Sequence, residues 1–156
     1  MKVLLIVCLV LVPAIFGQSK TGCVTLKHLN FGGYLTSSTK NDDKTRNVAA
    51  KEDDPEKWDI QDAGDGTYTI MNKEFDEYLV ASSSKMAHNH YVYLWIPGKS
   101  GLSGHKWKIT KDGKYSVIEN VQRPSCLIQG SGTWVYSQVV TRCDVAKIFK
   151  WRIESC

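Results

Sequence analysis

One five-residue pattern, centred on a tryptophan, occurs three times in this sequence: EKWDI at 56–60, HKWKI at 105–109 and FKWRI at 149–153. The tryptophans Trp58, Trp107 and Trp151 are separated by 49 and 44 residues. Recurrence at a near-constant period is the mark of an internally repeated fold. The chain is therefore expected to fold as repeats of about 45 residues.

A second sequence feature recurs with nearly the same period as the tryptophans. Each repeat contains two apolar residues nine positions apart, and these pairs are Leu26 with Leu35, Ile70 with Leu79 and Ile118 with Leu127. The two landmarks together place three repeats at approximately 23–66, 67–112 and 113–156. These six apolar residues and the three tryptophans are predicted to form one shared core.

The local pattern of the repeats is that of β-strands. Segments such as YTIMN, YVYLW, YSVIE and KWRIE alternate apolar and polar residues, and DAGDGT, PGKSGLSG and KDGK separate them as turns. Each repeat has room for about four short strands, whereas a propeller needs about four to eight blades rather than three repeats. The predicted fold is all-β, a β-trefoil with three pseudo-threefold repeats.

The first 17 residues differ from the rest of the chain. Met1 and Lys2 precede an uncharged apolar run, Val3 to Phe16, that ends at Gly17. This is the layout of a signal peptide and is shorter than the roughly 20 residues of a membrane span. We expect residues 1–17 to be removed and residues 18–156 to form a single secreted, extracellular domain, monomeric and without a membrane span.

Charge and cysteine content narrow the class of protein further. Residues 18–156 carry 19 basic and 16 acidic side chains, a bias too small to indicate nucleic acid as a partner. Four cysteines remain after removal of residues 1–17, which in an exported chain favours two disulfides with three possible pairings. They are Cys23, Cys126, Cys143 and Cys156.

The third repeat, CLIQGSGTWVYSQVVTRCDVAKIFKWRI, resembles a ricin-type repeat, which runs from Cys-Leu to a second Cys and then Q-x-W. The resemblance implies a disulfide between Cys126 and Cys143 and leaves Cys23 to pair with Cys156. The sequence departs from the family at two sets of positions. The glutamine of Q-x-W is replaced by Glu56, His105 and Phe149, and the family's sugar-binding aspartate by Thr36, Val80 and Ile128. A ricin-style galactose site is therefore not expected.

Two further resemblances cover more of the chain. MNKEFDEYLVASSSKMAHNHYVYLW is similar to the trefoil part of silkworm 30-kilodalton haemolymph lipoproteins. The size, signal segment, cysteine number and tryptophan content resemble the cysteine- and tryptophan-rich salivary proteins of about 16 kilodaltons from mosquitoes. The salivary resemblance implies secretion into a host's blood and a non-enzymatic role in binding or blocking.

The sequence contains few groups arranged for catalysis. The motifs G-x-S-x-G, H-E-x-x-H and the P-loop are absent, and the acidic run in KEDDPEKWD is typical of a solvated loop. His88 and His90 are two residues apart and would share one face of a strand, but no third metal ligand accompanies them. We expect no enzyme activity, no cofactor and no metal.

Aromatic residues cluster in two predicted hairpins. Tyr91, Tyr93 and Trp95 alternate with Val92 and Leu94, so one of these two sets faces the core. Trp134 and Tyr136 fall at the equivalent place in the third repeat, where the first repeat has Val48 and Ala50. If the aromatic residues point outward they form a binding patch; otherwise they close the base of the barrel.

A basic cluster spans the junction of the second and third repeats and comprises Lys106, Lys108, Lys111, Lys114 and Arg123. A groove lined by these residues would attract sulfated glycans or acidic proteins, although ordinary surface lysines give the same pattern.

The sequence as a whole favours a secreted, non-catalytic binding protein that sequesters or blocks an extracellular glycan or host protein. A lectin with a sugar site outside the ricin position is one alternative, and a receptor-binding, cytokine-like trefoil is another. A third is a Kunitz-type trefoil inhibitor with its reactive bond at Lys40, Lys44 or Arg46.

Overall fold

The computed structural model of the chain describes residues 21–156, so the predicted signal segment lies outside the described residues. This part of the chain forms twelve strands and one short 3-10 helix. No helix within it is long and apolar enough to cross a membrane. The strands are β1 Gly22–His28, β2 Tyr34–Lys40, β3 Thr45–Lys51, β4 Trp58–Gly64, β5 Thr67–Asn72, β6 Glu77–Met86, β7 Asn89–Trp95, β8 Trp107–Asp112, β9 Tyr115–Asn120, β10 Ser125–Gln129, β11 Val135–Gln138 and β12 Lys150–Ser155, and the helix η1 is Lys147–Phe149.

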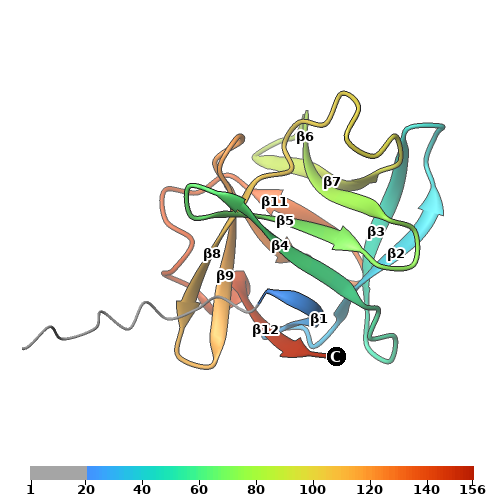
Figure 1. Cartoon of the computed structure of the whole chain (residues 1–156). Helices are drawn as coiled ribbons and strands as arrows, with labels where there is room; N and C mark the ends of the chain where they lie inside the picture. Colours follow the sequence, from blue (N-terminus) through green and yellow to red (C-terminus); the bar gives the residue numbers. More distant parts are fainter. Residues whose placement is uncertain (1–20) are drawn as a thin grey trace, which may run out of the picture.

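Antiparallel pairing closes six of these strands into a ring. Around the ring the order is β1, β4, β5, β8, β9 and β12, and β12 pairs with β1 again. The other six strands form the hairpins β2–β3, β6–β7 and β10–β11, which join one another through β3–β7, β7–β11 and a bridge between Ala49 and Trp134. Figure 1 shows the hairpins lying against one end of the ring. This confirms the expected all-β, β-trefoil-like fold.

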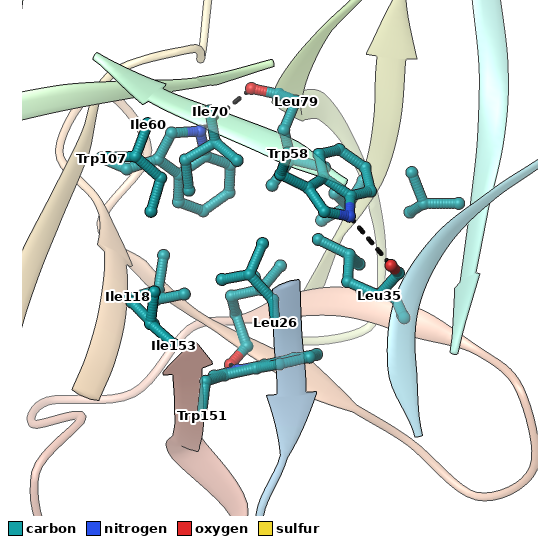
Figure 2. Packing of buried hydrophobic residues seen from close by; sticks show 14 of the residues in the cluster. Leu26, Leu35, Trp58, Ile60, Ile70, Leu79, Trp107, Ile118, Trp151 and Ile153 are labelled. Carbon is teal, nitrogen blue, oxygen red and sulfur yellow. Dashed lines mark hydrogen bonds between the residues drawn. The ribbon is translucent and has the colours of Figure 1, made fainter. Parts of the chain in front are cut away.

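The core lies inside the ring and is made of the residues that the repeat predicted (Figure 2). All nine of the predicted core side chains have no exposed surface: Leu26, Leu35, Trp58, Ile70, Leu79, Trp107, Ile118, Leu127 and Trp151. Val24, Ile60, Leu94 and Ile153 pack in the same cluster. The prediction of a shared core is therefore confirmed for every residue it named.

The recurring tryptophan also makes the same hydrogen bond each time. The indole N–H of Trp58 donates to the carbonyl of Leu35 at 2.9 Å, that of Trp107 to Leu79 at 3.0 Å and that of Trp151 to Leu127 at 2.9 Å. Each bond joins a ring strand to the first strand of a hairpin. A buried indole needs a partner for its N–H, and this contact supplies one while it fixes the hairpin against the ring.

Two disulfides join the four cysteines in the pairing that the ricin-type resemblance implied. Cys23 at the start of β1 bonds Cys156 just after β12, with 5.5 Å between their Cα atoms. Cys126 in β10 bonds Cys143 in the segment before η1, with a Cα separation of 5.6 Å. The second bridge lies in a small cluster with Val117, Ile128 and Phe149, so it holds the β11–β12 connection against β9 and β10.

A largely buried ion pair links the first two hairpins. Arg46 in β3 donates from Nε to Glu77 Oε2 at 2.8 Å and from Nη2 to Glu77 Oε1 at 3.1 Å. Its guanidinium also lies 3.8 Å from the ring centroid of Phe75, and the hydrogen bond to Glu77 raises the pKa of Arg46 further. Arg46 is therefore a structural residue and not an exposed reactive-site residue of an inhibitor, whereas Lys40 and Lys44 are exposed near the β2–β3 turn.

His28 is buried at the end of β1 and is held in one tautomer. Its Nδ1 accepts the backbone N–H of Phe31 at 3.2 Å, so the ring proton is on Nε2, which lies 2.8 Å from the Ile148 carbonyl. The edge of the imidazole packs against Trp151 with 4.9 Å between ring centroids. A second proton on Nδ1 would point at the Phe31 N–H, so two hydrogen-bond donors would face each other in a buried site. Burial accordingly lowers the pKa of His28 from its ordinary value of 6.5, despite the favourable bond to Ile148.

We predict that the free energy of unfolding decreases as the pH falls below 6.5, partly because of His28. The unfolded chain takes up a proton at His28 near pH 6.5, whereas the folded chain does so only at lower pH, so acid favours unfolding. The variant His28→Asn should reduce this decrease, because Asn72 and Asn120 make the corresponding turn contacts elsewhere in the chain. Urea unfolding at pH 7 and pH 5 measures the effect. An unchanged pH dependence in the variant would contradict it.

Candidate functional site

The outer face of β7 carries the aromatic residues singled out in the sequence. Val92 and Leu94 point into the core and are 3% and 0% exposed. Tyr91, Tyr93 and Trp95 lie on the other face and are only partly buried. The strand therefore divides as its alternation predicted, with the aromatic set on the outside.

The neighbouring strand β11 extends this aromatic face. Tyr136 pairs with Tyr91 across β11 and β7, and Trp134, just before β11, is 70% exposed. A cluster of large, exposed apolar side chains commonly marks a binding site. This exposure distinguishes Trp134 from Trp58, Trp107 and Trp151, which are fully buried.

The assignment of Val48 and Ala50 to the equivalent place in the first repeat is wrong by one residue. Leu35 pairs with Ala50 in the first hairpin, as Leu79 pairs with Leu94 in the second. Ala50 therefore corresponds to the buried Leu94, and both Val48 and Ala50 are buried. The outward positions of β3 are Asn47 and Ala49, so the aromatic face is confined to β7 and β11.

A cavity of about 320 Å³ lies at β7, β11 and the β6–β7 turn, and we call it the aromatic cavity. Its main lining residues are Met86, Asn89, Tyr91, Ser131, Trp134 and Tyr136. Of the predicted site residues it brings together Tyr91, Trp134 and Tyr136. Met86, which is 56% exposed, and Asn89 were not predicted. No repeat landmark falls on either residue, because both lie at the turn between β6 and β7.

Two polar groups lie at the wall of the aromatic cavity. The side-chain oxygen Asn89 Oδ1 is buried and has no hydrogen-bond partner among the described residues. His90 is also buried, and its Nδ1 lies 2.7 Å from the Ser82 carbonyl. Burial lowers the pKa of His90, and the charges of Lys85 and Arg123 lower it further. His90 is therefore neutral at physiological pH, and the cavity combines apolar walls with uncharged polar groups.

A second cavity, of about 430 Å³, lies on the other side of Tyr93, and we call it the arginine cavity. Its polar and aromatic lining residues include Asp42, Ser82, Ser84, Tyr93, Trp95 and Arg123. Tyr91 lines the aromatic cavity and Tyr93 lines the arginine cavity, and their rings stack with 6.1 Å between the centroids. The predicted aromatic site is thus divided into two, and Arg123 from the predicted basic cluster joins the second part.

The other members of the basic cluster lie along the β8–β9 hairpin. Lys106 precedes β8, Lys108 pairs with Glu119, and Lys111 pairs with Ser116 near the turn that contains Lys114. Arg123 follows the opposite end of the hairpin. Five residues of strand separate the two ends, a distance of roughly 17 Å. The structure therefore separates Lys111 and Lys114 from Arg123 instead of placing them side by side.

The two histidines considered as metal ligands do not share a strand face. β7 begins at Asn89, so His88 lies in the preceding turn, where it is exposed, whereas His90 is buried. Within residues 21–156 no group of three or more His, Cys, Asp or Glu side chains could hold a metal ion.

The positions of the ricin family's sugar-binding aspartate are buried in this chain. Thr36, Val80 and Ile128 are 0%, 4% and 5% exposed, and Thr36 Oγ1 donates to the Ala49 carbonyl at 3.3 Å. Val80 and Ile128 have no acceptor for a sugar hydroxyl, and the Thr36 hydroxyl is buried and already bonded to the backbone. The polar contacts of any ligand site must therefore come from other residues, and the two cavities provide them.

Comparisons with known proteins agree with this geometry. Residues 13–95 match the ricin-type beta-trefoil lectin domain-like family. A salivary protein from Culex quinquefasciatus of the Cysteine and Tryptophan-Rich (CWRC) family is 36% identical, with a TM-score of 0.79 over 89% of this chain and 96% of that one. A second salivary CWRC protein from the same mosquito is 26% identical, with a TM-score of 0.78 over the same shares of both chains.

A designed threefold-symmetric protein, ThreeFoil, shares the fold at 17% identity, with a TM-score of 0.71 over 86% of this chain and 99% of that one. No curated protein sequence matches the chain significantly. The chain therefore belongs to the Cysteine and Tryptophan-Rich (CWRC) family and has the β-trefoil fold of ricin-type lectin domains.

Proposed function

We propose that the protein is a secreted, non-catalytic binding protein that captures a small extracellular ligand in the aromatic cavity. The observation that carries the proposal is the exposed indole of Trp134 beside Tyr91 and Tyr136 at a cavity of about 320 Å³. Cavities of about 300 to 1,000 Å³ with mostly apolar walls and a few polar groups are typical of small-molecule sites. The protein would act by sequestering its ligand or by blocking a host factor.

Family membership and the disulfides support the extracellular part of the proposal. The two similar CWRC proteins are salivary, and disulfides persist in oxidising compartments outside the cytosol. The threefold ring and core would serve as a rigid mount, because binding residues commonly lie on loops and edges that a rigid scaffold positions. The aromatic face fits this role. It occurs on β7 and β11 but not on β3, so the scaffold that the three hairpins share does not require it.

Titration with the neutral apolar dye N-phenyl-1-naphthylamine tests the proposal. The dye should bind the wild-type protein with increased fluorescence, and Trp134→Ala should weaken its affinity about tenfold, because the variant loses one aromatic wall. Val145→Ala is the matched control, since Val145 is 65% exposed and lies outside the cavity. The control should bind like wild type.

Two outcomes would count against a small apolar ligand. One is a wild-type protein that does not bind the dye, and the other is a Trp134→Ala variant that binds it unchanged. A glycan array on the same proteins tests the lectin alternative. Binding to a glycan that depends on Trp134, without dye binding, would replace the proposed ligand by a sugar.

A further inference from the structure

Arg123 occupies a turn position that carries phenylalanine in the two corresponding turns. The same backbone hydrogen bond identifies these turns: Phe31 N–H donates to His28 Nδ1 at 3.2 Å, Phe75 N–H to Asn72 Oδ1 at 3.1 Å and Arg123 N–H to Asn120 Oδ1 at 2.9 Å. The three turns thus share one backbone arrangement, but two of them carry an apolar side chain and the third carries the cationic Arg123. Such a change is not required by the core that the repeats share.

The guanidinium of Arg123 is only partly satisfied by the protein. Its Nη2 donates to Ser103 Oγ at 3.1 Å, whereas Nη1 is buried and has no hydrogen-bond partner within the described residues. Arg46 and Arg142, in contrast, each hold a carboxylate, that of Glu77 and that of Asp144. A buried donor without a partner costs about 1 to 3 kcal/mol, so an added acceptor at Nη1 would be favourable.

Gly104 provides the space that the guanidinium occupies. A Cβ at this position would collide with Arg123 Nη1 and with the Ala81 carbonyl. The Gly104 carbonyl meanwhile accepts hydrogen bonds from the Ala81 N–H at 2.9 Å and from Asn120 Nδ2 at 2.7 Å. Arg123 therefore lies against a fixed segment of backbone and is held at the arginine cavity.

A bulge in β6 supplies further residues to the arginine cavity. Ala81 pairs with Val92 and Lys85 with His90, so four steps along β6 oppose two along β7. The corresponding register in β2–β3 has one extra residue, from Ser37 with Val48 to Lys40 with Arg46, and β10–β11 has a continuous register. Bulges redirect side chains and are common beside functional sites. Here the bulge places Ser82, Ser83 and Ser84 at the cavity.

Aromatic side chains form the floor of the same cavity. Tyr93 and Trp95 both line it, and the Trp95 indole is fixed by a hydrogen bond from Nε1 to the Ser100 carbonyl at 2.8 Å. Burial, with smaller contributions from Tyr91 and Asp42, raises the pKa of Tyr93, so its hydroxyl stays protonated. The cavity thus offers flat apolar surface next to hydroxyl donors.

Asp42 is the acidic residue at the rim, and its charge is already engaged. Its Oδ1 accepts the backbone N–H groups of Lys44 and Thr45 at 2.8 and 2.7 Å and the Thr45 hydroxyl at 2.9 Å. These bonds lower the pKa of Asp42. Among the described residues that line the cavity, Arg123 is the one with a basic side chain, and its charge and that of Lys85 both lower the pKa of His90. The Asp42 carboxylate is thus already hydrogen-bonded within its own turn, whereas Arg123 Nη1 lacks an acceptor among the described residues, so an anion would bind at Arg123.

We propose that the arginine cavity binds a small organic anion, a sulfonate, sulfate ester or carboxylate attached to a flat apolar group. The guanidinium of Arg123 would turn its unpartnered Nη1 toward the anionic group, which would accept hydrogen bonds from it and from the serine hydroxyls of the β6 bulge. The flat group would lie against Tyr93 and Trp95. A guanidinium suits such oxyanions because its planar donors match two oxygens at once. This site is separate from the aromatic cavity, and it extends the proposed function to a second ligand class.

A pair of dyes that differ by one sulfonate group separates the two cavities. The anionic dye 8-anilinonaphthalene-1-sulfonate (ANS) is compared with neutral N-phenyl-1-naphthylamine in titrations of wild type, Arg123→Gln and Arg142→Gln. We expect Arg123→Gln to weaken ANS binding about tenfold or more, as for loss of a charged hydrogen bond, and to leave the neutral dye unaffected. Arg142→Gln makes the same charge change at an exposed arginine and should bind both dyes like wild type.

Several results would overturn this assignment. Unchanged ANS affinity in Arg123→Gln would exclude the site. An equal loss of ANS affinity in Arg142→Gln would show that the effect comes from net charge alone. Arg123→Lys should recover only part of the affinity, because lysine keeps the charge without the fork; full recovery would contradict a fork-shaped contact. The midpoint of thermal unfolding of each variant shows whether it is folded.

Competition identifies the source of the anion. Displacement of ANS by 1-naphthoate supports a flat organic anion, whereas displacement by a heparin oligosaccharide and not by 1-naphthoate would replace it with a sulfated glycan. Loss of neutral-dye binding in Trp134→Ala, with ANS binding intact, keeps the two proposals independent of each other.

Discussion

Replacing Trp107 with alanine should lower the free energy of unfolding by about 4 to 5 kcal/mol, the upper range for large-to-small changes in a core. Trp107 has no exposed surface, and its indole N–H donates to the Leu79 carbonyl at 3.0 Å. The variant loses the packing of the ring and also leaves a buried carbonyl without its donor. Since small domains are stable by only about 5 to 15 kcal/mol, this loss would remove between about a quarter and nearly all of the stability.

Two further variants separate packing from hydrogen bonding in this prediction. Trp107→Phe keeps much of the buried ring but loses the donor, and it should cost about 2 kcal/mol, within the range for an unsatisfied buried group. Trp134→Ala should change stability by less than about 0.5 kcal/mol, as is usual for exposed positions. Urea unfolding followed by circular dichroism gives all three values. Equal losses in Trp107→Ala and Trp134→Ala would refute the division into core and surface tryptophans.

Removal of the disulfide between Cys23 and Cys156 should be the second large effect. The bridge spans 133 residues, whereas that between Cys126 and Cys143 spans 17. In the loop-entropy description these spans correspond to about 5 and about 3 kcal/mol, as upper estimates. The longer bridge also joins β1 to the residue after β12, the two strands through which the ring of paired strands closes.

Paired alanine variants test this order. Alanine is preferred to serine because Cys126 is fully buried and Cys143 nearly so, and a buried hydroxyl would add its own cost. Cys23→Ala with Cys156→Ala should lower the urea midpoint more than Cys126→Ala with Cys143→Ala. A larger loss from the shorter bridge would show that packing around Cys126, rather than closure of the chain, dominates the contribution of the disulfides.

The core could be predicted because it depends on repeated residues. Trp58, Trp107 and Trp151 recur with fixed neighbours, and each makes the same contact in the structure. Fixed spacing reveals such a role without any knowledge of tertiary contacts. The two disulfides followed from the resemblance to a ricin-type repeat and not from spacing alone, since four cysteines allow three pairings.

The candidate sites could be predicted only in part, because they lie where the repeats differ. Tyr91, Trp134 and Tyr136 were found as aromatic residues in a strand pattern, but their division from Tyr93 and Trp95 depends on how β7 packs. The serines of the β6 bulge could not be recognised, because a register shift of two residues leaves no local signal. Arg123 was grouped with nearby lysines by sequence distance, whereas the length of the β8–β9 hairpin separates it from Lys111 and Lys114.

Glu56 is a single residue whose contacts could not be predicted from the sequence around it. In sequence it belongs to an acidic run typical of a solvated loop. In the structure its carboxylate accepts hydrogen bonds from Ser37 N and Ser37 Oγ, both at 2.7 Å, and from Asn72 Nδ2 at 2.6 Å. The contacts join β2 to β5 and come from residues 16 and 19 positions away. Such long-range polar contacts are set by the fold and are not visible in a local pattern.

The most direct test of the account is a map of amide chemical shifts with each dye. With N-phenyl-1-naphthylamine, the largest shifts should fall on Asn89, Tyr91, Trp134 and Tyr136, and with ANS on Ser82 to Ser84, Tyr93 and Arg123. The β8–β9 turn, residues 112–115, should not respond to either dye. Shifts confined to that turn, or the absence of shifts at the two cavities, would contradict the proposal that this protein binds ligands on the outer face of its hairpins.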